Sequence, residues 1–170
     1  AIDAYNLLFE LNPYNEKDLL KAHKLMTSEL VSESGIYRKG GVGVFKEDKC
    51  LHLAPPADRV PTLIKELLQW VETTTTHPLI SSCVFHYEFE FIHPFADGNG
   101  RMGRMWQTLL LMQWQPIFAW LPVETIVKEH QQQYYQAIAQ SDATANSTPF
   151  ITFMLQCILK AFQETEKSNQ

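Results

Sequence analysis

The sequence predicts an all-α domain, a bundle of helices interrupted by one β-hairpin. Apolar residues recur at three- and four-residue spacings through most of the chain, which is the pattern of a helix with one buried face. Only between residues 36 and 53 does the pattern change, to short apolar runs on either side of a charged turn at residues 46–49. A chain of 170 residues, 45% of them hydrophobic, is long enough to bury a core as a single domain.

Two helices are expected before the hairpin. Residues 4–11 are apolar enough for a short helix, which Asn12 and Pro13 would stop. Asn15 is a typical N-cap for a longer helix to about residue 31, with acidic residues in its first turn and Gly35 at its end. The hairpin that follows is too small to be stable alone, so we expect it to pack on the helices.

The remaining helices are expected after the hairpin. Asp58 can cap a helix at residues 60–75. Residues 79–92 are apolar nearly all round, which predicts a central buried helix. Further helices are expected from about residue 99 to 114, from Pro122 to about residue 140, and at residues 147–160 with Ser147 as the cap.

Composition narrows the function classes. The net charge of −5 argues against a nucleic-acid partner, which would require a basic face. The three cysteines, Cys50, Cys83 and Cys157, are far apart and form no paired motif, which favours a reducing, cytoplasmic compartment. No apolar run reaches transmembrane length, no signal peptide is visible, and no membrane partner is expected.

One stretch, residues 93–104 with the sequence HPFADGNGRMGR, has the composition of a phosphate-binding site. Gly98, Gly100 and Gly103 permit positive φ angles and close approach of the backbone to an oxyanion. The N–H groups and dipole at the start of the following helix would add to this cradle. Arg101 and Arg104 share one helix face and can reach two phosphoryl groups.

The same stretch contains a candidate base and a candidate metal ligand. Asp97 supplies a carboxylate suited to Mg²⁺, which binds through one or two carboxylates plus substrate phosphates. A neutral His93 imidazole could take the proton of an attacking hydroxyl. A metal triad of His86, His93 and Asp97 is conceivable, but a hydrogen-bonded core histidine is the better interpretation of His86. Glu90 is expected to be solvated or paired with a basic side chain, not catalytic.

These residues resemble the signature of the Fic family, His-Pro-Phe-x-(Asp/Glu)-Gly-Asn-Gly-Arg-x-x-Arg, at every specified position. The resemblance covers about residues 29–162 and implies the Fic fold, a helical bundle with a β-hairpin flap. It implies that His93 is the general base and Asp97 the Mg²⁺ ligand. The triphosphate of ATP would be held at the α-phosphate by Asn99 and the amides near Gly98 and Gly100, and at the β- and γ-phosphates by Arg101 and Arg104.

The resemblance also assigns two recognition surfaces. The flap residues Cys50, Leu51, His52 and Leu53 would dock a segment of the target protein by strand addition. The adenine pocket would be lined by Tyr134, Tyr135, Ile138 and Asp142, although the family pattern leads us to expect asparagine in place of Asp142. The alternatives are a plain connector for the hairpin and a packing face for the helix.

The resemblance favours one reaction. Doc-type members, which phosphorylate their targets, have lysine where this chain has Gly100, so transfer of AMP from ATP to a Ser, Thr or Tyr hydroxyl is favoured, with release of pyrophosphate. The alternatives are removal of AMP, transfer from UTP or CDP-choline, and a non-catalytic module that binds peptides. No complete inhibitory motif (Ser/Thr)-x-x-x-Glu-(Gly/Asn) is present. The chain is therefore expected to be a fragment whose inhibitory helix lies upstream or on a partner chain, which would leave Arg104 free.

Overall fold

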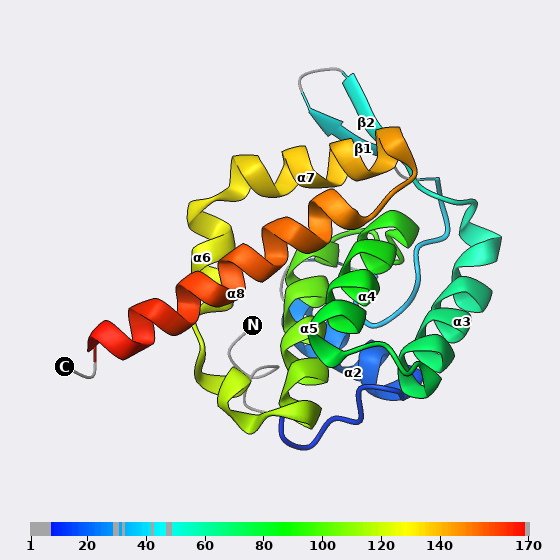
Figure 1. The fold of residues 1–170 in the computed structure, drawn as a ribbon. Coiled ribbons are helices and arrows are strands. Elements are labelled where there is room, and N and C mark those ends of the chain that lie inside the picture. The colour runs from blue at the N-terminus through cyan, green and yellow to red at the C-terminus, as the bar shows by residue number, and fades with distance from the viewer. Residues whose placement is uncertain (1–7, 29–30, 32, 42, 47–48, 169–170) are drawn as a thin grey trace.

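A computed structural model of the protein describes residues 8–28, 31, 33–41, 43–46 and 49–168. The α-helices are α2 (Glu16–Thr27), α3 (Val60–Thr73), α4 (Pro78–Ile92), α5 (Asn99–Trp114), α6 (Val123–Glu129), α7 (Gln131–Thr144) and α8 (Thr148–Ser168) (Figure 1). Short 3₁₀ turns, η1 (Ala57–Arg59) and η2 (Pro116–Trp120), and two short strands, β1 (Gly43–Lys46) and β2 (Lys49–Leu53), complete the described elements. The all-α class is confirmed.

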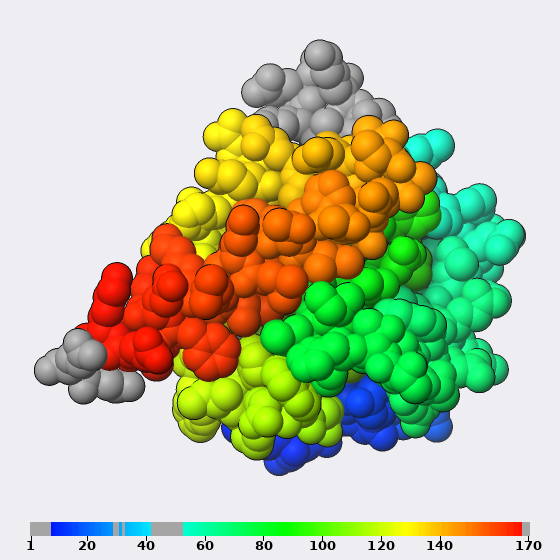
Figure 2. All heavy atoms as spheres, in the orientation of Figure 1, coloured from blue at the N-terminus to red at the C-terminus, as the bar shows by residue number. Residues whose placement is uncertain are grey.

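Helices α4 and α5 form the centre of the bundle. Helices α3 and α8 pack against α4, while α7 and α6 pack against α8 (Figure 1). The fully buried side chains come mainly from the central helices and α8, and include Phe85, Phe89, Met102, Trp106, Leu109, Phe150 and Met154. Figure 2 shows α8 crossing one face of the molecule, with its C-terminal turns projecting beyond the body.

The start of α2 is as predicted, but its end is not. Asn15 caps the helix, because its Oδ1 accepts from Lys17 N at 2.8 Å and from Asp18 N at 3.4 Å. The helix ends at Thr27, before the expected residue 31. Gly35 does not terminate it; at φ 76° it makes a later turn that returns to α2, where its N–H donates to Nδ1 of His23.

Three other boundaries differ from the predictions. Asp58 lies in the η1 turn and does not cap α3, whose N-cap residue, Arg59, makes no side-chain cap bond. The single helix expected after Pro122 is divided at His130, whose φ of −109° and ψ of 32° are not helical. Helix α8 extends to Ser168 and not residue 160. Of the helix expected at residues 4–11, residues 4–7 lie outside the described part and residues 8–10 form a turn.

The strands β1 and β2 pair antiparallel, from Gly43 opposite Leu53 to Lys46 opposite Lys49, with an irregularity between Val44 and Phe45. The pair lies beside α7 (Figure 1). The residues expected to dock a target, Cys50, Leu51, His52 and Leu53, all belong to β2. Their role in docking stays a prediction. Within the described residues, the chain has no helix that is long and apolar enough to cross a membrane.

Candidate active site

Helix α4 ends at His93, and the backbone of this residue is held on both sides. His93 is the C-cap in the left-handed conformation, with φ 50° and ψ 62°, and its N–H donates to the Phe89 carbonyl. Its own carbonyl accepts from Nε of Arg38 at 2.7 Å. A left-handed non-glycine residue is strained unless its surroundings fix it, and such positions cluster at functional sites. The position of the imidazole is therefore set by the end of α4.

Arg38 is a buried cation that no sequence motif singles out. It is 4% exposed, and its guanidinium donates to the carbonyls of His93, Ile92, Pro55 and Gly40. Its backbone N–H donates to the Pro94 carbonyl at 3.0 Å. Burial lowers its pKa. Because Arg38 precedes the hairpin and Pro55 follows it, one side chain ties both ends of the hairpin to the end of α4.

Asn99 closes the turn between α4 and α5. Its Oδ1 accepts from Phe95 N, and its Nδ2 donates to Phe95 O, both at 2.9 Å. The side chain is 3% exposed. The side-chain amide of Asn99 therefore holds the loop, and the role of Asn99 at the α-phosphate stays a prediction. Only its backbone N–H, in the first turn of α5, remains for a ligand.

His23, on α2, supports this turn from inside. Its ring stacks on Phe95 with centroids 3.6 Å apart and planes 3° apart. Nδ1 accepts from Gly35 N, so the neutral ring carries its proton on Nε2 and donates to the Asp97 carbonyl at 3.0 Å. Burial lowers the pKa of His23, which favours this neutral form. No local sequence pattern indicates a partner for His23.

Asp97 has an open side chain at the start of α5. Its side chain is 62% exposed, and Oδ2 lies 4.0 Å from Nη2 of Arg101. Its Oδ1 accepts from Gly98 N at 2.6 Å, and the role of Gly98 at the α-phosphate stays a prediction. Among the described residues no group of three His, Cys, Asp or Glu side chains could hold a metal. An exposed single carboxylate still fits Mg²⁺ that takes its other ligands from phosphates and water.

Helix α5 begins directly after Asp97 with an open N-terminus. Gly98, at φ 84°, is the N-cap and makes no side-chain cap bond, so the first-turn N–H groups have no partner within the helix. Gly100 and Gly103 lie within the helix, and of the three motif glycines only Gly98 has positive φ, contrary to expectation. At the other two, the absence of a side chain matters. A Cβ atom at Gly100 or Gly103 would approach side chains that pack against α5.

The two motif arginines differ in their surroundings. Arg101 is 31% exposed and lies next to Asp97. Arg104 is 21% exposed, and its Nε lies 3.6 Å from Oε1 of Glu124 on α6. The expectation that Arg104 is free is therefore wrong, because α6 brings a carboxylate to it. A triphosphate would have to share Arg104 with Glu124 or displace Glu124.

Behind the motif lies a buried polar network. His86 Nδ1 is 2.7 Å from Oε1 of Gln107, and its Nε2 is 3.0 Å from the Tyr134 hydroxyl, so it is the hydrogen-bonded core histidine predicted. Burial lowers the pKa of His86 to about 3. Glu90 is also buried, and burial raises its pKa to about 7, although Arg104 and the Tyr134 hydroxyl oppose the increase. Glu90 is thus close to a cation, as expected, but it is not solvated.

The four residues expected at the adenine pocket all lie on α7 but differ in their exposure. Tyr134 is 2% exposed and its hydroxyl contacts His86, so it is not placed to line an open pocket. Tyr135 is 40% exposed and Ile138 is partly buried. Asp142 Oδ1 accepts from the Tyr87 hydroxyl at 2.6 Å. The helical spacing of residues 135, 138 and 142 puts these three on one face.

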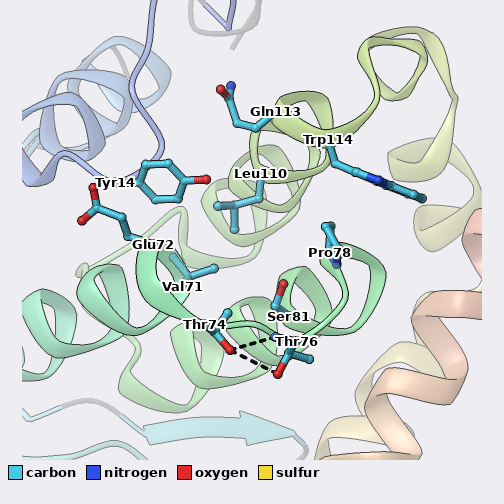
Figure 3. A pocket seen from close by; sticks show the side chains of 10 residues that line it. All are labelled: Tyr14, Val71, Glu72, Thr74, Thr76, Pro78, Ser81, Leu110, Gln113 and Trp114. Carbon is cyan, nitrogen blue, oxygen red and sulfur yellow. Dashed lines mark hydrogen bonds between the residues drawn. The ribbon is translucent and has the colours of Figure 1, made fainter.

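A separate cavity of about 260 Å³ lies at the opposite end of α4 and α5. Figure 3 shows Tyr14 and Glu72 on one side of it and Trp114 on the other, with the Thr74 hydroxyl bonded to Thr76 at its rim. None of the residues expected at the active site lines this cavity.

The sequence pattern of the Fic/DOC family matches residues 13–111, more than half of the 170-residue chain, and the protein therefore belongs to this family. The resemblance seen in the motif is confirmed. The matched segment includes α2, the hairpin and the whole turn between α4 and α5, which are the elements that build the site.

Individual relatives agree with this assignment. The chain is 28% identical over 148 residues to the protein adenylyltransferase Fic of Drosophila melanogaster, an alignment that covers 85% of this chain and 28% of that protein. The crystal structure of a Fic family protein from Desulfovibrio desulfuricans G20 superposes with a TM-score of 0.93 at 51% identity, covering 99% of this chain and 52% of that one.

The fold is also shared with BepC of Bartonella tribocorum, solved with bound AMPPNP. That structure gives a TM-score of 0.66 at 17% identity and covers 89% of this chain and 78% of BepC. At this identity the likeness concerns the fold alone. A protein of this fold therefore binds an ATP analogue. The chain spans about 28% of the length of the Drosophila enzyme and about half that of the Desulfovibrio protein.

Proposed function

We propose that this domain transfers AMP from ATP to a Ser, Thr or Tyr hydroxyl of a target protein, and of itself, with release of pyrophosphate. One observation supports the proposal above the others: a single turn brings the His93 imidazole, the exposed Asp97 carboxylate and the uncapped N-terminus of α5 together. A base, a cation ligand and an anion cradle are the three components that phosphoryl-group chemistry needs.

In the proposed complex the triphosphate lies at the N-terminus of α5. The N–H groups of Asn99, Gly100 and Arg101 face its oxygens, and the helix dipole favours the negative charge. Arg101 and Arg104 hold the β- and γ-phosphates through charge-assisted hydrogen bonds. Asp97 would hold Mg²⁺, which when bound neutralises charge on the phosphates and on the leaving pyrophosphate.

In the reaction, the target hydroxyl oxygen attacks the α-phosphorus while its proton passes to Nε2 of His93. The bond between the α-phosphorus and the oxygen bridging to the β-phosphate breaks, and this oxygen leaves with the pyrophosphate. The His93 imidazolium then returns its proton to solvent. The cradle opposes the charge that develops on the leaving group, so base and cradle contribute separately.

Two further surfaces complete the proposal. Tyr135, Ile138 and Asp142 contact the base of the nucleotide, with Asp142 able to accept from the adenine amino group. The target segment adds to the open edge of β2, where Leu53 is 77% exposed. Since Arg38 ties both ends of the hairpin to His93, a docked segment would be held at a fixed distance from the base.

Labelling with α-³²P-ATP and Mg²⁺ tests the proposal. The protein is incubated alone and with a lysate, and the His93→Ala variant is compared with wild type. We expect the variant to lose transfer by at least about 10²-fold, the scale of a missing general base, while ATP binding by calorimetry is retained. Labelled UTP, CDP-choline and an AMP-modified acceptor are run in parallel. Equal labelling by both proteins, or labelling only from another nucleotide, would refute transfer of AMP by this site.

A further inference from the structure

Glu90 lies one helical turn before His93 and faces the same buried space. Its side chain is 10% exposed, and its Oε2 lies 4.0 Å from Nδ1 of His93. The His93 Nδ1 atom is itself buried, while the imidazole as a whole is 18% exposed. Nδ1 therefore faces inward toward Glu90, and Nε2 is the nitrogen that can meet a substrate.

This orientation imposes a condition on the chemistry. A neutral imidazole carries one proton, on either Nδ1 or Nε2. To accept a proton at Nε2, the ring must carry its own proton on Nδ1, which is the buried nitrogen. An anion beside Nδ1 favours that tautomer and stabilises the imidazolium that forms when the ring accepts the second proton.

We propose that Glu90 is a positioning residue for His93, whose carboxylate selects the Nδ1–H tautomer and so makes Nε2 the base. The inference rests on the function proposed above and adds to it a residue outside the family signature. Glu90 acts through His93 and does not itself touch the substrate.

The groups around Glu90 come from three other helices and support this role. Arg104 approaches from α5, and Glu124 of α6 competes for Arg104 at 3.6 Å. The Tyr134 hydroxyl approaches from α7 and interacts with both Glu90 and His86. These contacts hold the carboxylate in place, and Arg104, a cation that acts on it, lies on a different helix from His93.

The hydrogen bonds of the Tyr134 hydroxyl determine how strongly it can interact with the Glu90 carboxylate. Gln107 Nε2 donates to Cys83 Sγ, so Gln107 Oε1 accepts from Nδ1 of His86. His86 Nε2 then carries a lone pair, to which the Tyr134 hydroxyl donates. A hydroxyl has one proton and cannot donate fully to His86 and Glu90 together. The bond to His86 therefore limits what Tyr134 can donate to Glu90, which also faces His93 and Arg104.

The protonation state of the Glu90 carboxyl should depend on pH near neutrality. Burial raises its pKa to about 7, while Arg104 and Tyr134 lower it, and His93 faces it across 4.0 Å. Below this range the carboxyl is neutral and the electrostatic preference for Nδ1–H is lost. Above it the carboxylate is charged and the preference is complete. Activity that depends on Glu90 should therefore increase as the pH rises through about 7.

The test compares Glu90→Gln and Glu90→Asp with wild type, and uses Glu88→Gln as the matched control. Glu88 is on the same helix and also has a pKa raised by burial, but its charged neighbour is Asp142. Long-range ¹H–¹⁵N NMR of His93 reports the tautomer without any need for activity. We expect predominantly Nδ1–H in wild type, Glu88→Gln and Glu90→Asp at pH 8, and a mixture in Glu90→Gln.

Kinetics provide the second readout. In Glu90→Gln we expect kcat to fall on the order of 10- to 100-fold with KM for ATP within about threefold of wild type, since a positioning residue changes the base and not the cradle. The acid limb of the kcat profile should move to lower pH, and Glu90→Asp should restore part of kcat. Loss of kcat in Glu90→Gln without a change of tautomer would overturn the proposal.

The two proposals can fail separately. If wild type transfers no nucleotide, the proposed function fails, while the His93 tautomer in Glu90→Gln still decides the inference. If Glu90→Gln does not fold, the tautomer of His93 is followed in wild type from pH 5 to 8. A tautomer population that increases toward Nδ1–H as Glu90 ionises supports the proposal, and one that is constant over this range overturns it.

Discussion

Gly103 lies where α5 crosses α4, at the buried network behind His93. A Cβ atom at this position would be 2.8 Å from Cδ2 of His86 and 3.0 Å from Oε1 of Glu90. Both neighbours are packed and cannot withdraw without cost. Gly100 in the same helix differs, because its Cβ would meet Nη1 of Arg104 at 3.2 Å, the far end of a flexible side chain. The two glycines therefore offer a matched pair.

We expect Gly103→Ala to be less stable than Gly100→Ala by about 1–3 kcal/mol, the usual cost of overpacking. Both variants gain the same helix propensity, so the comparison isolates the clash. Urea unfolding monitored by circular dichroism measures the difference. Equal free energies of unfolding would mean that α4 and α5 can separate freely at this point.

His86 should make stability depend on pH in the acid range. Its pKa falls to about 3 in the folded protein because burial disfavours the cation, against an ordinary value of 6.5. The contribution of neutral His86 to the free energy of unfolding is fully present above about pH 6.5 and is lost as the pH falls toward 3. Glu90 acts in the opposite sense, since its raised pKa makes stability decrease as the pH rises from 4.5 to about 7.

His86→Gln is therefore expected to flatten the dependence of unfolding free energy on pH. Comparison with wild type isolates His86, because Glu90 and the other carboxyls are present in both proteins. The slope should decrease by up to about 1.4 kcal/mol per pH unit, the value for one proton. Urea unfolding between pH 3.5 and 4.5 measures it. An unchanged slope would show that His86 is protonated in the native protein.

At the scale of elements, Arg38 joins the end of α4 to both ends of the hairpin. Its guanidinium donates to four carbonyls, at 2.6–3.2 Å, from residues 40, 55, 92 and 93. Two of these carbonyls belong to the last turn and the C-cap of α4, where no intrahelical donor is available. Lysine cannot replace this arrangement, because its single ammonium lacks the fork of donors.

We expect Arg38→Lys to lower the free energy of unfolding by about 2–4 kcal/mol, since buried carbonyls lose charged donors. Lys39→Met is the control, because Lys39 is the exposed neighbour. Urea unfolding and labelling with α-³²P-ATP are measured together. A variant as stable as the control would show that water satisfies these carbonyls in place of Arg38.

The sequence predicted the elements that are determined by residues close together in the chain. Helices α4 and α5 were found because their apolar residues are continuous and glycine and asparagine mark the turn between them. The break at His130 was missed because neither Pro nor Gly causes it; the Nδ1–H of His130 donates to the Ile126 carbonyl and ends α6. His23 and Arg38 were missed for a different reason. Their partners at the site are 74 and 55 residues away, and no local pattern records a contact of that range.

At the scale of the whole molecule, α8 closes the bundle over α4. Cys83 on α4 and Cys157 on α8 are both buried and reduced. Burial raises the pKa of Cys83 to about 12 and that of Cys157 to about 11. Since the thiolate is the reactive form, neither thiol should react while α8 is packed in place. Their reactivity therefore reports whether the bundle opens as one unit.

In a Cys50→Ser background, we expect both thiols to react with a disulfide reagent at pH 8 at least about 10³-fold more slowly than an exposed cysteine. Gln133→Cys on α7 supplies that reference, because Gln133 is exposed. Cys83 and Cys157 should become labelled at the same rate if α8 and α4 separate only when the whole core unfolds. Mass spectrometry of the labelled peptides distinguishes them. Faster labelling of Cys157 alone would show that α8 detaches by itself, and the molecule would then be two cooperative units.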